Sequence, residues 1–175
     1  MDVQHLIRLH DEGARVKYLF FWGHRTPGPG YLSQWWPSPF SVDGVTYATA
    51  EHYMMAGKAR LFGDEETAAA VIAAPHPGAA KDLGRRVRGF REDAWAAHRT
   101  SVVVAANQAK FTQHPELRDY LAGTGDRVLV EASPLDRVWG IGLAADDPRA
   151  ANPAEWLGQN LLGFALMAVR ATLAA

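Results

Sequence analysis

Two charged residues in one segment have the spacing of a catalytic pair. Glu51 and Lys58 are seven residues apart in the run Ala-Glu-His-Tyr-Met-Met-Ala-Gly-Lys. In an α-helix this spacing gives both side chains nearly the same azimuth, roughly 10 Å apart along the axis. A carboxylate and an amine that face one place are suited to general acid–base chemistry. The alternative is a solvated helix face, although His52 and two methionines are unusual on such a face.

A local basic cluster stands out in a nearly neutral chain. Its members are Lys81, Arg85, Arg86, Arg88 and Arg91. Guanidinium groups clamp phosphate with paired N–H donors, but clusters of this kind are also common as plain surface charge. Helical spacing would place Lys81, Arg85 and Arg88 on one face.

A further stripe of residues repeats with helical periodicity. Arg99, Val102, Ala106 and Lys110 share one face of a predicted long helix, and Asn107 lies three residues before Lys110. Small residues with a cation at either end form the wall of a binding site or the edge of a helix whose cations reach solvent. The sequence leaves both alternatives open.

The segment 131–142 combines several functional side chains in one loop. It holds two carboxylates, Glu131 and Asp136, the indole of Trp139, and a glycine on each side of Ile141. Binding and catalytic residues concentrate in irregular loops that follow regular elements. The glycines would let a ligand approach backbone N–H groups, and the indole offers a flat face for a base, although tryptophan is also common in cores.

These residues require a framework of helices and short strands. Helices are predicted at about 49–62, 64–74, 78–88, 92–112, 115–121 and 153–173, and strands at 18–22, 127–132 and on both sides of an Asp43-Gly44 turn. Thr49 is expected to cap the helix that Gly63 ends. The region from Tyr31 to Tyr47 is strand-like, and residues 24–30 form a loop. The fold class is therefore α+β, a mostly helical single domain around a small β-sheet.

Composition narrows the function classes. The chain has 175 residues, of which 48% are hydrophobic, and 18 basic against 19 acidic residues give a formal charge of −1. This length fits one domain, and a neutral field does not favour bulk binding of nucleic acid or of an anionic membrane. No apolar run is long enough to span a bilayer and no signal peptide is evident, so we expect a cytoplasmic protein without membrane contact.

Cysteine and histidine usage limits the chemistry further. The chain has no cysteine, which excludes disulfides, thiolate nucleophiles and Cys-ligated metals and suits a reducing cytoplasm. Its seven histidines show no pair at ligand spacing, so we expect no metal.

Five blocks in a fixed order resemble the YbiA-like, or NADAR, family. They are Leu32–Phe40, Tyr47–Ala59, Ala106–Phe111, Asp136–Gly142 and Gly158–Gly163. The resemblance extends from about Lys17 to Leu173. One departure is Gln34-Trp35, where the family commonly has Asn-Phe, and the longer amide and larger ring are expected to reshape the pocket wall.

The resemblance implies a YbiA-like α+β fold and hydrolysis of the N-glycosidic bond between ribose and a nitrogenous base, without a cofactor. It assigns residues 17–175 to the domain and leaves 1–16 as an N-terminal extension. Two substrate classes go with the family: ribosylamino-pyrimidine phosphates of early riboflavin synthesis, and ADP-ribose attached to guanine in nucleic acid or nucleotides. A non-catalytic module that binds ADP-ribose or nucleotides is the alternative.

On this resemblance the expected catalytic residues are Glu51, Asp136 and Lys58. Cleavage builds positive charge at the anomeric carbon and negative charge on the leaving base, so either carboxylate would stabilise the sugar or activate water. Lys58 would protonate the leaving nitrogen, bind phosphate or form a Schiff base with the opened ribose. The expected substrate-binding residues are Trp139 as a stacking platform, Gly140 and Gly142 as backbone donors, Lys110, Arg85 and Arg25 for phosphate, Asn160 for ribose hydroxyls, and Glu131.

Overall fold

A computed structural model describes residues 1–174 of the chain. Within them, seven α-helices accompany four short strands, which confirms the α+β class and the helical majority. The strands form two separate two-stranded sheets. Chain contacts define two units, unit 1 from Met1–Ser33 with the chain from Asp119 onward, and unit 2 from Gln34–Arg118. None of the described helices combines the length and apolar character needed to cross a bilayer.

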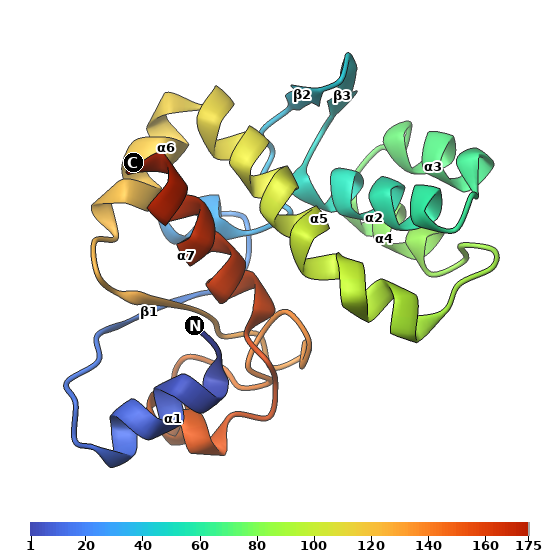
Figure 1. Cartoon of the computed structure of the whole chain (residues 1–175). Helices are drawn as coiled ribbons and strands as arrows, with labels where there is room; N and C mark the ends of the chain where they lie inside the picture. Colours follow the sequence, from blue (N-terminus) through green and yellow to red (C-terminus); the bar gives the residue numbers. More distant parts are fainter. Residues whose placement is uncertain (175) are drawn as a thin grey trace. The chain divides into compact units, whose positions relative to one another are not determined.

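Unit 1 is built on a parallel pair of strands. β1 (Tyr18–Phe21) pairs with β4 (Val128–Glu131), in a register that joins Tyr18 to Val128 and Phe21 to Glu131. The helix α7 (Leu161–Leu173) packs on β4 (Figure 1). Its other helical elements are α1 (Val3–Asp11), η1 (Pro29–Leu32), η2 (Pro148–Ala151) and η3 (Pro153–Glu155), and α6 (Pro115–Gly123) crosses the boundary between the units.

The N-terminal segment contributes to the core of unit 1. Asp2 caps α1 by accepting the N–H of His5 at 2.8 Å, and Leu6 is completely buried. The cluster around Leu6 includes Val128, Val130 and Ile141. Residues 3–11 therefore form a packed helix, while the division into a 1–16 extension and a 17–175 domain stays a prediction.

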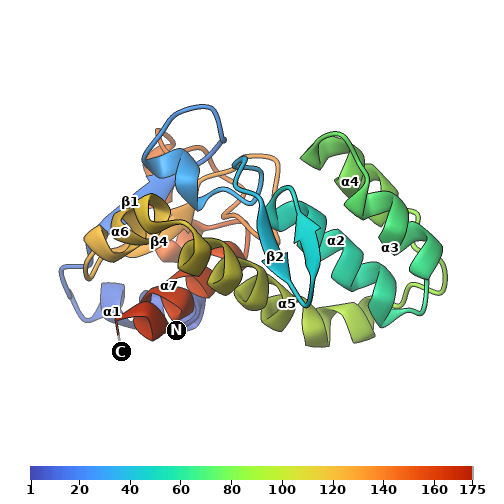
Figure 2. The ribbon, with the colours of Figure 1, turned by 90° about the horizontal axis from the view of Figure 1, so that it is seen from above.

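Unit 2 is a group of helices with a small hairpin. Its elements are the antiparallel pair β2 (Phe40–Val42) and β3 (Val45–Tyr47), followed by α2 (Ala50–Leu61), α3 (Glu65–Ile72), α4 (Pro77–Gly84) and α5 (Glu92–Gln113). Asp43 and Gly44 both have positive φ, which confirms the predicted hairpin turn. Thr49 caps α2 as predicted. The helices α3, α4 and α5 all pack on α2 (Figure 2).

Two glycines allow the close packing of α2. A Cβ at Gly57 would lie 3.0 Å from Val102 of α5, and a Cβ at Gly84 would collide with the sulfur of Met55. Because neither glycine carries a side chain, α2 reaches α5 on one side and the end of α4 on the other.

Three predicted elements differ from the observed ones. The helix predicted at 78–88 ends at Gly84, and the strand-like region before Phe40 holds η1 and irregular chain. The last helix begins at Leu161, not near Pro153. Its start is delayed because Asn160 has a φ of +53° and residues 157–160 donate backbone hydrogen bonds to the loop at 137–141.

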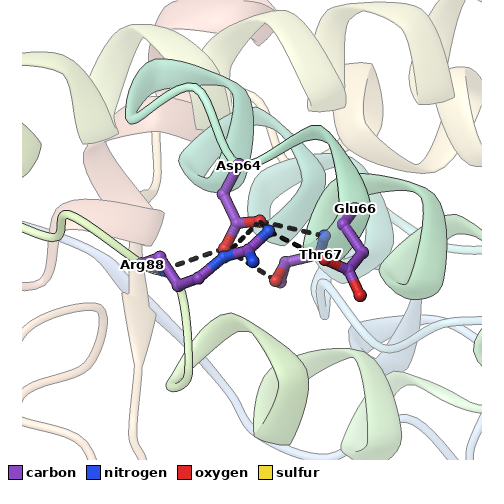
Figure 3. A network of polar contacts seen from close by, with 4 residues as sticks. All are labelled: Asp64, Glu66, Thr67 and Arg88. Atoms are coloured by element: carbon purple, nitrogen blue, oxygen red, sulfur yellow. Dashed lines mark hydrogen bonds and ion pairs between the residues drawn. The ribbon is translucent and has the colours of Figure 1, made fainter.

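An ion pair connects the start of α3 to the chain after α4. Asp64 caps α3 and accepts from Thr67, while its carboxylate also receives the backbone N–H of Arg88 at 2.9 Å and the guanidinium at 2.6 Å (Figure 3). Arg88 lies 3.0 Å from Glu66 as well. The expected helical face of three cations is therefore wrong, because Arg88 lies beyond α4 and faces two carboxylates.

We expect Asp64→Asn to lower the unfolding temperature, and to do so less in acid. The hydrogen bonds from Arg88 hold the pKa of the Asp64 carboxyl well below its usual range. A lowered carboxyl pKa stabilises the folded state above the ordinary value of about 4, and this stability is lost as the pH falls toward the folded value. Thermal melts at pH 7 and pH 3 should show a smaller gap between wild type and variant at pH 3. The exposed Asp82→Asn is the control, and a gap independent of pH would contradict the prediction.

We also expect Gly163→Ala to destabilise the chain by about 1–3 kcal/mol. A Cβ at Gly163, in the first turn of α7, would overlap the backbone oxygen of Leu129 and the side-chain amide of Asn160. Gly123→Ala is the matched control, because nothing lies within 4 Å of a Cβ at this last residue of α6. Urea unfolding compares the two variants with wild type. Equal unfolding midpoints for Gly163→Ala and Gly123→Ala would contradict the prediction.

Candidate functional site

Unit 2 contains a set of buried polar residues on and beside α2 and α5. Gln34, Glu51, Asn107 and Lys110 are each no more than 5% exposed. We call them the buried polar cluster. Burial of polar groups costs free energy unless they are hydrogen-bonded or serve a ligand, so each member needs an explanation.

Gln34 joins the start of α2 to the middle of α5. Its backbone oxygen accepts the N–H of Glu51 at 3.0 Å, which places this carboxylate in the first turn of α2. Its side-chain Oε1 accepts from Asn107 Nδ2 at 3.2 Å, and its Nε2 donates to the sulfur of Met54 at 3.3 Å. Both ends of the Gln34 amide are therefore used.

Asn107 is only partly satisfied. Its Nδ2 donates to Gln34 and to the backbone oxygen of Val103, the latter at 2.9 Å. Both partners are acceptors, so the amide nitrogen must point toward them. Asn107 Oδ1 points elsewhere, and it is buried without a hydrogen-bond partner among residues 1–174.

Lys110 lies one helical turn beyond Asn107 and is completely buried. Burial lowers the pKa of its amine to about 7. Such an amine exists in both protonation states at neutral pH, so it can donate a proton or act as a base or nucleophile. The stripe of Arg99, Val102, Ala106 and Lys110 thus ends in a buried amine and not in a cation that reaches solvent.

Lys58 has a different set of contacts from the one expected. Its ammonium donates to the backbone oxygen of Gly84 at 2.9 Å and lies 4.2 Å from the ring centre of Phe90. Burial lowers the pKa of Lys58, while the nearby Glu92 opposes this shift. Through these contacts Lys58 connects α2 to the end of α4 and to Phe90.

In unit 1, Asp136 shapes the loop that follows β4. Its Oδ1 accepts the N–H groups of Val138 and Trp139, both at 2.8 Å. Its backbone oxygen accepts the N–H of Gly142 at 3.0 Å. The carboxylate is held in one orientation, with the half-buried indole of Trp139 beside it in the chain.

The expectation that Gly140 and Gly142 offer backbone donors is not met at Gly142, because its N–H is already bonded to Asp136. The two glycines instead permit close packing. A Cβ at Gly140 would lie 2.8 Å from the backbone oxygen of Glu131, and Gly142 has a φ of +71°. The packing and backbone conformation of the loop therefore explain why both positions are glycine.

The contact of Asn160 with ribose hydroxyls stays a prediction, although both ends of its amide already have partners within the fold. Asn160 is completely buried, its Oδ1 accepts the N–H of Glu131, and its Nδ2 donates to the oxygen of Leu129, both at 2.9 Å. Both ends of the amide join β4 to the start of α7. Glu131 is the last residue of β4 and is half-buried.

The expected phosphate-binding residues have very different environments. Arg25 is exposed on the loop after β1, and Arg85 is exposed and donates to Asp82 at 3.2 Å. Lys110 is buried, as described above. No group of three or more His, Asp or Glu side chains placed to hold a metal ion occurs within residues 1–174.

Sequence reasoning did not assign roles to Gln34 and Asn107. Their hydrogen bond joins positions 73 residues apart, which no local pattern reveals. A weaker signal was present, because Asn107 and Lys110 interrupt an otherwise apolar helix face with Val103 and Phe111.

Known proteins resemble this chain over most of its length. A family model described as the NADAR domain matches residues 20–174. N-glycosidase R617 of Acanthamoeba polyphaga mimivirus is 41% identical over 161 residues, covering 88% of this chain and 95% of the relative. N-glycosidase YbiA of Escherichia coli is 36% identical over 137 residues, covering 78% and 76%. The NMR structure of Escherichia coli YbiA superposes with a TM-score of 0.73 at 31% identity, covering 91% of this chain and 86% of that one.

We expect the free energy of unfolding to rise between pH 7 and about pH 10 because of Lys110. Its folded pKa is about 7, whereas an unfolded lysine keeps its proton to about 10.4. Across this interval the unfolded state binds up to one proton more than the folded state. A higher pH therefore favours folding, by up to about 1.4 kcal/mol per pH unit.

Urea unfolding at several pH values measures this slope. Lys110→Met should lose the rise, whereas Lys17→Met, at an exposed lysine 4.0 Å from Asp126, should keep it. Equal slopes in wild type and Lys110→Met would refute the prediction.

Proposed function

This chain belongs to the NADAR domain family and is an N-glycosidase, and we propose that its substrate is a phosphorylated ribose joined to a nitrogenous base or amine. Ribosylamino-pyrimidine phosphates of riboflavin biosynthesis are the first candidates. The observation that carries the proposal is the buried polar cluster, which holds a carboxylate and an amine that titrates near neutral pH.

The chemistry of the reaction fits these groups. Water attacks the anomeric carbon, the bond from carbon to nitrogen breaks, and the leaving nitrogen takes up a proton. Protonated Lys110 can supply that proton, and Glu51 can stabilise the positive charge on the sugar or take a proton from the water. Because Lys58 is held at the end of α4, Lys110 replaces it in this proposal as the amine of the reaction.

From the resemblance to the family, we also propose roles for residues in the loop after β4 of unit 1. Asp136 is the second carboxylate, and two backbone N–H groups fix its orientation. Trp139 follows in the same loop, and its half-exposed indole suits stacking on a base. We propose no metal or cofactor, and the absence of cysteine supports a cytoplasmic location.

A second candidate substrate is guanine that carries ADP-ribose, in nucleotides or nucleic acid. Exposed cations at Arg25 and Arg85 favour it, because they could contact a longer anionic substrate without a basic field over the whole chain. A module that binds ADP-ribose without cleaving it is the competing class of function.

An assay for released base tests the proposal. The purified protein, treated with a chelator, is given ribosylamino-uracil phosphate and guanine-linked ADP-ribose in parallel, and free base is measured by chromatography. Release from the first compound alone supports the riboflavin intermediate, and release from the second alone supports the ADP-ribosyl substrate. Release from neither, with measurable binding of ADP-ribose, would replace the proposal by the non-catalytic module.

We expect Glu51→Gln and Asp136→Asn each to lower kcat by about 100-fold or more. Both substitutions keep the size and one acceptor oxygen, so an Asn at 136 can still accept from the backbone of Val138 and Trp139. Glu12→Gln, at an exposed carboxylate, is the control and should leave turnover unchanged. Turnover that survives the double variant would refute the assigned roles.

A further inference from the structure

We propose that the buried side-chain oxygen of Asn107 accepts a hydrogen bond from a ribose hydroxyl, so that Asn107 determines specificity for ribose over deoxyribose. The inference rests on the proposed function, because it concerns the sugar of that same substrate. It assigns to Asn107 a binding role, and to Gln34 the role of positioning the Asn107 amide.

Asn107 carries a buried acceptor that is not satisfied within the chain that the structure describes. Asn107 is completely buried, and its Oδ1 has no hydrogen-bond partner among the described residues of the chain. A buried acceptor without a donor destabilises the folded state, so such an atom usually serves a ligand or an ordered water.

The neighbouring amide of Gln34 does not satisfy this atom. Gln34 Nε2 donates to Met54, and its Oε1 receives the Asn107 amide nitrogen. A flip of the Asn107 amide would point its oxygen at Gln34 Oε1 and at the oxygen of Val103, which are both acceptors. The network therefore holds Oδ1 in place, so its donor has to come from outside the described residues, and we assign that donor to the ligand.

A hydroxyl group is the kind of donor that suits Asn107 Oδ1. A hydroxyl can donate to an amide oxygen and accept from an ammonium group at the same time, and Lys110 follows Asn107 by one helical turn. An ionised phosphate offers only acceptor oxygens, so it cannot donate the hydrogen bond that Asn107 Oδ1 lacks. A sugar hydroxyl therefore fits this place better than the phosphate that the sequence assigned to Lys110.

Titration calorimetry with ribose 5-phosphate, 2-deoxyribose 5-phosphate and 3-deoxyribose 5-phosphate tests the inference. We expect wild type to bind ribose 5-phosphate at least about 10-fold more tightly than one of the two deoxy sugars. Asn107→Leu, which removes the acceptor and keeps the volume, should bring this ratio close to one. Gln34→Leu should lower the ratio as well, because it releases the Asn107 amide.

Gln108→Ala is the matched control, since this neighbouring amide donates to Thr112 at 3.4 Å, outside the buried polar cluster, and its ratio should equal that of wild type. A ratio near one in wild type, or a preference for ribose retained in Asn107→Leu, would overturn the inference. If circular dichroism shows that Asn107→Leu does not fold, the wild-type ratio and Gln34→Leu decide. A protein that prefers ribose but releases no base overturns the proposed function and leaves this inference standing.

Discussion

The hydrogen bond from Asn107 to Gln34 connects positions 73 residues apart, and the buried polar cluster of unit 2 depends on it. This bond orients the Asn107 amide through the Gln34 amide, and it thereby fixes the direction of Asn107 Oδ1. The same Gln34 receives the backbone of Glu51 through its own carbonyl, so one residue sets both the start of α2 and the face of α5. The two amides satisfy each other at this depth, and the oxygen of Asn107 is the atom that they leave over.

Helix packing brings these residues to hydrogen-bonding distance. Gly57 lets α2 approach Val102 of α5, and Gly84 leaves space for Met55 on the other side of α2. Lys58 then joins α2 to the oxygen of Gly84. Close packing of α2 on α5 therefore also supports the hydrogen bond between Gln34 and Asn107. A looser contact between the two helices would leave these amides too far apart.

Unit 1 shows how polar residues near a candidate site can be structural. Both ends of the Asn160 amide form hydrogen bonds with the backbone of β4. The N–H of Gly142 donates to the backbone oxygen of Asp136. A loop that leaves a short strand must satisfy its own backbone groups, and the nearest polar side chains do this first. Asp136 combines this role with one that suits catalysis, since its carboxylate is fixed but remains only half-buried.

The sequence by itself determined the features that depend on neighbouring residues and on the order of its motifs. The cap at Thr49, the Asp43-Gly44 turn and the helical majority follow from local geometry, and the five blocks identified the family. Only the tertiary structure decided that Lys110 is completely buried, that Lys58 is tied to α4, and that Asn160 faces β4. Burial and hydrogen-bond partners depend on atoms from distant parts of the chain, and these set both the lowered pKa of Lys110 and the acceptor left at Asn107.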